Sequence, residues 1–327
     1  FSLLPILIMP RLFVRYVAWI IGFSALLWCL GGIVVVVVFL LDMRTIESAG
    51  WRVVQADGYQ LAERLKRLET GQYALSFGPS RSAQLSSKIV GEPLLNLNFV
   101  YGNPDVVAEL LGLLSDRQWS NIRRIYFLVD LHTMETGEFQ RDFGAVSKPV
   151  TLTLAIIDVL ASMKFQAIRD AGYALWWNLT GTYPYYIHDD GFVVQTRTER
   201  YSGKNAVDDD HSWAGDTSEL EWAASELDGA VGLKSVKALA DEHDVPVIFY
   251  TATLPDDYAR AASTFLKRHM EAAIFYLDEI YVLARVPGLS DRFEFFSDET
   301  HLNAVGLKLL FSKDWAPYLV TKSTMEQ

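Results

Sequence analysis

Cysteine is almost absent from this sequence, since Cys29 is the only one among 327 residues. A single cysteine cannot form an intrachain disulfide, and the chain is long enough to bury a substantial core without one. A basic excess is also missing, because 40 acidic residues against 29 basic ones give a formal net charge of −11. Nucleic-acid binding needs a basic footprint, so we exclude nucleic acid as a partner.

Charged side chains are entirely missing from Tyr16–Leu41, a run dominated by Val, Ile, Leu and Phe. A helix needs about 20 apolar residues to cross the hydrocarbon core, whereas the apolar part of a signal peptide has about 7–15. We therefore predict an uncleaved transmembrane helix at 16–41 that contacts the lipid bilayer. Arg11 and Arg15 precede it, which predicts a cytoplasmic N-terminal segment (1–15) and a main domain in the periplasm or its extracytoplasmic equivalent. The apolar stretch Phe1–Met9 could lie in the interface or pack on a partner in the membrane.

Short apolar runs alternate with helical patterns beyond the linker 42–70. We predict an α/β domain at 71–327 with five parallel strands in the order 2-1-3-4-5, because this alternation is typical of βαβ units. The predicted strands are Tyr73–Phe77, Pro93–Val100, Ile122–Leu131, Val245–Tyr250 and Phe293–Phe296, and the predicted helices are Ser48–Thr70, Asp105–Leu114 and Ser218–His243.

A long insertion, at about 134–216, separates the third and fourth predicted strands. Its first part, Val150–Ala174, has a helical pattern, and an acidic stretch, Asp208–Asp210, stands near its end beside His211. Long insertions are often lids or binding loops, and a structural flap is the alternative. Consecutive carboxylates point in different directions, so we interpret the acidic stretch as a solvated loop and predict no metal and no cofactor. Between these parts stand five aromatic residues: Trp176, Trp177, Tyr183, Tyr185 and Tyr186.

Three motifs stand where predicted strands end, which is where open α/β sheets bind ligands. Ser80 follows the first strand in a turn, where its hydroxyl would be presented and its N–H could face an oxyanion. A nucleophilic serine needs a base and an orienting carboxylate, and His301 and Asp298 could supply them from one side of a turn. Gly102, in the turn after the second strand, could donate another N–H.

Two further residues have competing interpretations. Arg81 could bind an anionic group or cap a loop. His132, past the third strand, could contact substrate, but a structural hydrogen bond to the backbone is the favoured interpretation.

These motifs resemble the SGNH (GDSL-like) hydrolase superfamily over about residues 70–315. Gly78-Pro79-Ser80 stands where that family has Gly-Asp-Ser, Asn98–Gly102 stands at its second block, and Asp298–Gly306 matches its last block, Asp-x-x-His followed by glycine. The chain is most similar to the membrane-anchored branch that includes proteins of teichoic acid D-alanylation and alginate O-acetylation. The resemblance implies a three-layer sandwich around a five-stranded parallel sheet, similar to flavodoxin. It also implies that Ser80 is the nucleophile, His301 the base, Asp298 its orienter, and the N–H groups of Ser80 and Gly102 the oxyanion donors.

Two functions follow from the sequence. The first is an acyl esterase or O-acyltransferase that acts outside the cytoplasm on acylated glycan or lipid. The second is a catalytically degenerate accessory subunit of a membrane complex, because the third strand ends at Leu128–His132 without the family's oxyanion Asn and Pro79 is unusual before the serine. Its contacts with other integral membrane proteins would be made by Tyr16–Leu41 and the aromatic residues of the insertion.

Overall fold

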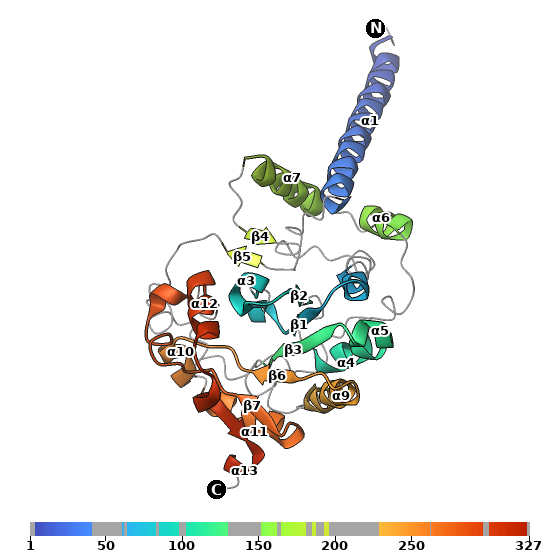
Figure 1. Cartoon of the computed structure of the whole chain (residues 1–327). Coiled ribbons are helices and arrows are strands. Elements are labelled where there is room, and N and C mark those ends of the chain that lie inside the picture. The colour runs from blue at the N-terminus through green and yellow to red at the C-terminus, as the bar shows by residue number, and fades with distance from the viewer. Residues whose placement is uncertain are drawn as a thin grey trace. The chain divides into compact units, whose positions relative to one another are not determined.

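The chain divides into two compact units (Figure 1): Phe1–Ala56 with Thr151–Tyr183, and Asp57–Val150 with Pro184–Gln327. A computed structural model describes residues 4–40, 61, 64–82, 85–97, 103–129, 152–161, 165–180, 185–187, 193–195, 229–261, 263–296 and 301–325.

The first unit is helical. Its first element, α1 (Leu4–Leu40), contains Phe13–Val38, which is long and apolar enough to cross a membrane and is the one such stretch in the described part of the chain. A membrane span and a signal sequence both fit a helix of this kind near an N-terminus. Two helices from the insertion, α6 (Leu152–Ala161) and α7 (Phe165–Thr180), contact α1. The helical pattern predicted from Val150 is therefore confirmed within these two helices.

The second unit is built on a six-stranded mixed sheet in the order β2-β1-β3-β6-β7-β8. The first five strands pair in parallel and β8 pairs antiparallel to β7. The prediction of a mostly parallel α/β sheet is therefore confirmed, but the sheet has six strands rather than the predicted five. Four predicted strands are confirmed, and they lie in the predicted order. The bounds are β1 (Tyr73–Phe77), β2 (Leu94–Asn96), β3 (Ile122–Leu128), β6 (Val247–Tyr250), β7 (Glu279–Tyr281) and β8 (Leu319–Thr321).

The predicted strand Phe293–Phe296 is wrong, because this segment forms a 3-10 turn, η6 (Phe293–Phe295). Its backbone groups bond locally and to the loop before helix α12 (Ala304–Ser312) rather than to a neighbouring strand. Phe296 N–H donates to the carbonyl of Phe293, and Asn303 donates from its backbone N–H to Phe295 O and from its side chain to Glu294 O. β7 occupies the fifth position of the sheet instead.

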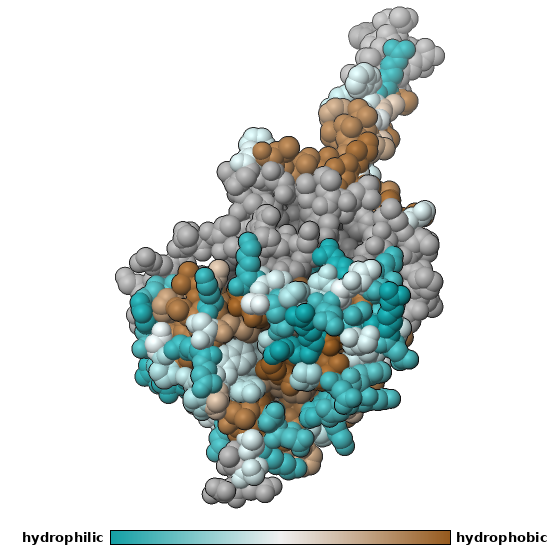
Figure 2. All heavy atoms as spheres, in the orientation of Figure 1, coloured by the Kyte–Doolittle hydropathy of each residue, from teal (hydrophilic) through white to brown (hydrophobic). Residues whose placement is uncertain are grey.

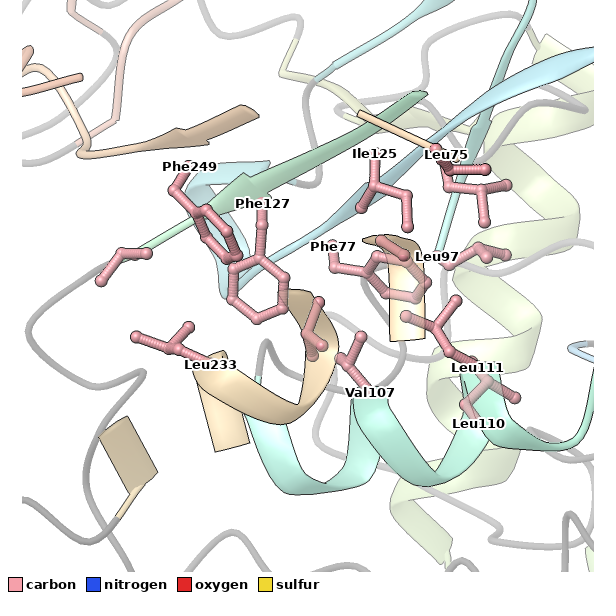
Figure 3. Close-up of a cluster of buried hydrophobic side chains, with 14 of the residues drawn as sticks. Leu75, Phe77, Leu97, Val107, Leu110, Leu111, Ile125, Phe127, Leu233 and Phe249 are labelled. Atoms are coloured by element: carbon pink, nitrogen blue, oxygen red, sulfur yellow. The ribbon is translucent and has the colours of Figure 1, made fainter. Parts of the chain in front are cut away.

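One face of the sheet packs against helices α4 (Pro104–Gly112), α9 (Gly229–Glu242) and α11 (Ser263–Tyr276). Alternate strand residues point to it, as the two-residue period of a strand requires. The rings of Phe127 and Phe249 lie together here with centroids 5.7 Å apart, and Leu233 and Val107 cover them (Figure 3). Asn103 begins α4 by accepting the N–H groups of the helix's first turn, which a side-chain oxygen satisfies at a helix start.

The opposite face carries the intervening residues, among them Tyr126, Leu128 and Tyr250. The helices here are α3 (Ser87–Val90), α10 (Asp256–Ala261) and α12. The sheet therefore buries apolar side chains on both faces, as a mostly parallel sheet must. The remaining elements are η2 (Lys66–Glu69), η3 (Ser80–Ser82), α5 (Asp116–Trp119), β4 (Tyr185–Ile187), β5 (Val193–Gln195), η7 (Ala316–Tyr318) and α13 (Lys322–Met325).

Candidate functional site

Ser80 begins the 3-10 turn η3 directly after strand β1, which is where the sequence predicts a nucleophile. The turn depends on Gly78, whose φ of 148° is a conformation that side chains with a Cβ rarely adopt. A Cβ at Gly78 would also stand 2.8 Å from Cβ of Leu128 and 2.9 Å from Cβ of Ser82. The chain therefore turns away from β1 in a space that only glycine fits.

A hydrogen-bond network holds the η3 turn in place. Ser82 donates from its hydroxyl to Pro79 O at 2.8 Å, and its backbone N–H donates to the same carbonyl. Asn96, fully buried at the end of β2, donates from Nδ2 to Ser82 O at 2.7 Å and to Leu85 O at 3.1 Å. Arg64 in turn donates to the carbonyl of Asn96 at 2.8 Å. The backbone on both sides of Ser80 is thus held by the side chains of Ser82, in the turn itself, and Asn96, from β2.

We expect Gly78→Ala to destabilise the protein by roughly 1–3 kcal/mol more than Gly91→Ala, because overpacking adds to the backbone strain. Gly91 is a matched control, since it also has a positive φ, of 78°, but a Cβ there would meet nothing within 4 Å. The free energy of unfolding, measured by guanidinium denaturation, checks this. Equal losses in the two variants would contradict the close packing described for the turn.

A small pocket lies beside this turn at the carboxyl end of the parallel strands. Its lining brings together Arg81 from η3, Leu128 at the end of β3, Tyr250 at the end of β6, and Leu302 before α12. Its volume of about 20 Å³ has room for a water molecule. Arg81, which follows Ser80, and Leu302, which follows His301, therefore line one pocket, although they are 221 positions apart in the sequence.

Two buried hydroxyl groups line the same pocket. Thr253 Oγ1 and Tyr250 Oη have no hydrogen-bond partner among the described residues, and both side chains are almost fully buried. Thr251 lies between the two in the sequence, but its hydroxyl already has a structural partner, because it accepts the N–H of Leu283 at 2.8 Å. A buried hydroxyl without a partner costs roughly 1–3 kcal/mol. Thr253 and Tyr250 are therefore suited to hydrogen-bond a water molecule, or a ligand atom of that size, in this pocket.

A further polar group supports the same face of the sheet. Tyr126 donates its hydroxyl to Glu92 at 2.9 Å, and Arg124 pairs with the same carboxylate at 3.2 Å. Burial, and then the bond to Glu92, raise the pKa of Tyr126 to about 12 from 10.0. Burial, and then the nearby Tyr126, also raise the pKa of Tyr250. Both hydroxyls consequently stay neutral throughout the physiological range.

These pKa values predict a loss of stability in alkali. Below pH 10 both the folded and the unfolded protein keep the Tyr126 proton, whereas between about pH 10 and 12 only the folded protein keeps it. The free energy of unfolding should then fall by roughly 1.4 kcal/mol per pH unit from this group. Guanidinium denaturation at pH 9 and pH 11 should show a smaller fall for Tyr126→Phe than for the wild type. An identical fall in both would contradict the assignment.

The predicted site residues are only partly covered by the described residues. Ser80 and Arg81 lie in η3, and His301 lies between the bridge residue Leu302 and the undescribed stretch before it. The other predicted residues lie outside the described residues: Gly102, His132, Asp298, and the acidic stretch Asp208–Asp210 with His211.

Sequence reasoning missed Asn96 and Thr253. Asn96 interrupts the apolar run of β2, and a polar residue within a buried strand was the available signal. Thr253 follows the fourth predicted strand, at the edge of the sheet where ligands bind, and this position could have indicated it.

Comparison with known proteins gives no relative: no family model, no curated protein and no solved structure matches this chain. Its function must therefore be inferred from the residues and their geometry.

Proposed function

We propose that this protein is a membrane-anchored, SGNH-like serine acyl esterase or O-acyltransferase with Ser80 as its nucleophile. One observation supports this most strongly: Arg81 and Leu302, the neighbours of Ser80 and His301, line the same pocket at the carboxyl end of the sheet. The strand order is also consistent, because the five parallel strands follow the 2-1-3-4-5 order of flavodoxin-like sheets.

The chemistry proceeds in two steps. The Ser80 oxygen attacks the acyl carbon of an ester while its proton passes to His301, which Asp298 orients. The bond to the leaving alcohol breaks, the alcohol takes the proton from His301, and the acyl group remains on Ser80. Water or an acceptor hydroxyl then attacks the acyl carbon while its proton passes to His301. The bond between the acyl group and the Ser80 oxygen breaks, and His301 returns the proton to that oxygen, which restores the Ser80 hydroxyl.

The surroundings of Ser80 fit an oxygen-rich substrate. Gly78 and the Asn96 network hold the turn, so the Ser80 N–H would stabilise the oxyanion without reorganisation. The Gly102 N–H would be the second donor. The Thr253 hydroxyl would bond to a water molecule or to a single substrate oxygen, and Arg81 adds a positive charge at the pocket. With α1 as a membrane anchor and Arg11 and Arg15 on the cytoplasmic side, the domain would reach acylated glycans or lipids on the outer surface of the membrane.

Labelling with a fluorophosphonate probe tests the proposal, because the probe reacts with activated serine nucleophiles. Detergent-solubilised wild type should be labelled, and Ser80→Ala and His301→Ala should not. Ser120→Ala is a matched control, since this exposed hydroxyl only donates to Arg117 O. Equal labelling of all four proteins would refute Ser80 as nucleophile. A folded wild type that is never labelled would instead favour the accessory-subunit role.

A further inference from the structure

The last turns of α1 pack against α7. A Cβ on Gly31 would stand 2.6 Å from Cδ1 of Ile168, so the two helices approach closely at this point. Ala171, one turn further along α7, is fully buried. Small residues allow such close approach between helices within a membrane. The buried residues of α1 recur at helical spacing and form one stripe: Gly31, Gly32, Val35 and Val38.

The insertion helices expose large apolar side chains elsewhere. In α7, Trp176 is 62% and Leu179 is 76% exposed, and in α6 Ile157 is 56% exposed. The hydrophobic surface of α1 continues onto the adjoining α7 (Figure 2). Contiguous exposed apolar surface of this kind marks a site of interaction with protein or membrane.

The contact with α1 sets the depth at which α7 would lie if α1 spans the bilayer. The 26 residues of Phe13–Val38 extend about 39 Å, roughly 9 Å more than the hydrocarbon core is thick. Centred in the bilayer, that stretch puts Gly31 about 7 Å inside the hydrocarbon boundary. Ile168 lies against Gly31 and must be near the same depth.

Length and charge are consistent with that position. With 10 and 16 residues, α6 and α7 are about 15 and 24 Å long, too short to span the core. Their charged residues are Asp158 in α6 and Arg169 and Asp170 in α7. Charges next to Ile168 exclude the centre of the bilayer but are tolerated at its boundary, where amphipathic helices insert about 5–10 Å.

We propose that α6 and α7 lie in the membrane interface beside the C-terminal end of α1, with Ile157, Trp176 and Leu179 in contact with lipid. This inference rests on the proposed membrane anchor and adds to it. The second unit is then joined to the bilayer at three points of the chain: after Leu40, before Leu152 and after Thr180.

Site-directed spin labelling of the full chain tests this in nanodiscs of phosphatidylcholine and phosphatidylglycerol. The native Cys29 supplies a label in α1, and a Cys29→Ser background allows single labels at Ile157→Cys and Leu179→Cys. Leu113→Cys is a matched control, because it is an exposed leucine of the second unit. The measured quantity is the ratio of collisions with oxygen, which partitions into lipid, to collisions with a water-soluble nickel chelate.

We expect labels at 29, 157 and 179 to give severalfold higher oxygen-to-nickel ratios than the label at 113. A high ratio at 29 with low ratios at 157 and 179 would overturn the inference while leaving the anchor intact, as would labels shielded from both reagents by protein. A low ratio at 29 would instead refute the anchor itself.

A pair of glycine variants tests the contact that sets the depth. Gly31→Leu should lower the ratio at 179 because it pushes α7 away, whereas Gly22→Leu should not, since a Cβ there meets nothing within 4 Å. Equal ratios in both variants would overturn the depth assigned to α7.

Discussion

Ser80→Ala should lower the rate of p-nitrophenyl acetate hydrolysis by roughly 10³- to 10⁶-fold, as loss of a serine nucleophile does in triad enzymes. Alanine removes only the oxygen and keeps the backbone of η3, so the turn should remain. The Gly78 and Asn96 interactions do not involve the Ser80 hydroxyl. The free energy of unfolding should therefore stay close to that of the wild type, and hydrolysis by the purified protein in detergent is the measurement.

The Ser120→Ala control should hydrolyse the ester at the wild-type rate. If Ser80→Ala hydrolyses it equally fast, the activity comes from elsewhere and Ser80 is the cap of a turn. If the rate falls but the variant also unfolds, the loss is structural, and thermal unfolding of the same samples separates these results.

Asn96→Leu should lower both stability and the rate of acyl-enzyme formation. The variant loses the bond to Ser82 O and leaves the buried carbonyl of Leu85 without its Asn96 donor. Unsatisfied buried groups of this kind cost roughly 2–4 kcal/mol in total. Because η3 would then shift, and a displacement of about 1 Å can reduce catalysis about 10²-fold, we expect a rate loss of that order. Asn96 is thus a positioning residue, since it acts through the turn that carries Ser80.

Asn121→Leu provides the matched control. Asn121 also donates from its Nδ2 to two carbonyls, those of Leu68 at 2.7 Å and Arg117 at 3.3 Å. It precedes the start of β3, whereas η3 follows the end of the neighbouring parallel strand β1, so the two lie at opposite ends of the sheet. It should lose stability and keep the wild-type rate of fluorophosphonate labelling. An Asn96→Leu variant that is labelled as fast as the wild type would show that the network does not position Ser80.

Much of the fold could be predicted because its main strands are buried on both faces. Tyr73–Phe77 and Val245–Tyr250 are apolar runs closed by turn residues or bounded by a helix, which is the pattern of a central parallel strand. Strands β7 and β8 escaped prediction because each has three residues, too few for a period to show. Phe293–Phe296 was wrongly predicted as a strand because its apolar residues suit a buried strand, whereas they belong to a 3-10 turn that packs against α12.

The site was predictable only in its chain order. Ser80 and His301 were predicted because each follows a predicted strand, and their roles stay a prediction. The strand predicted before His301 is a 3-10 turn, but the residues after Ser80 and His301 do line one pocket. The Asn96 bonds could not be found this way, because they join β2 to a turn 14 positions earlier. The contact between Gly31 and Ile168 likewise joins two segments that the sequence gives no reason to pair.

Peptide mass spectrometry of the fluorophosphonate adduct tests the central claim most directly, because it identifies the residue that carries the adduct. Digestion of labelled wild type should place the adduct on Ser80 and on no other serine of its peptide, including Ser82, whose hydroxyl is bonded to Pro79 O. His301→Ala, treated identically, should give only the unmodified peptide. An adduct on another residue, or an unmodified Ser80 peptide from folded wild type, would contradict the proposal that this chain is a serine acyl hydrolase or transferase.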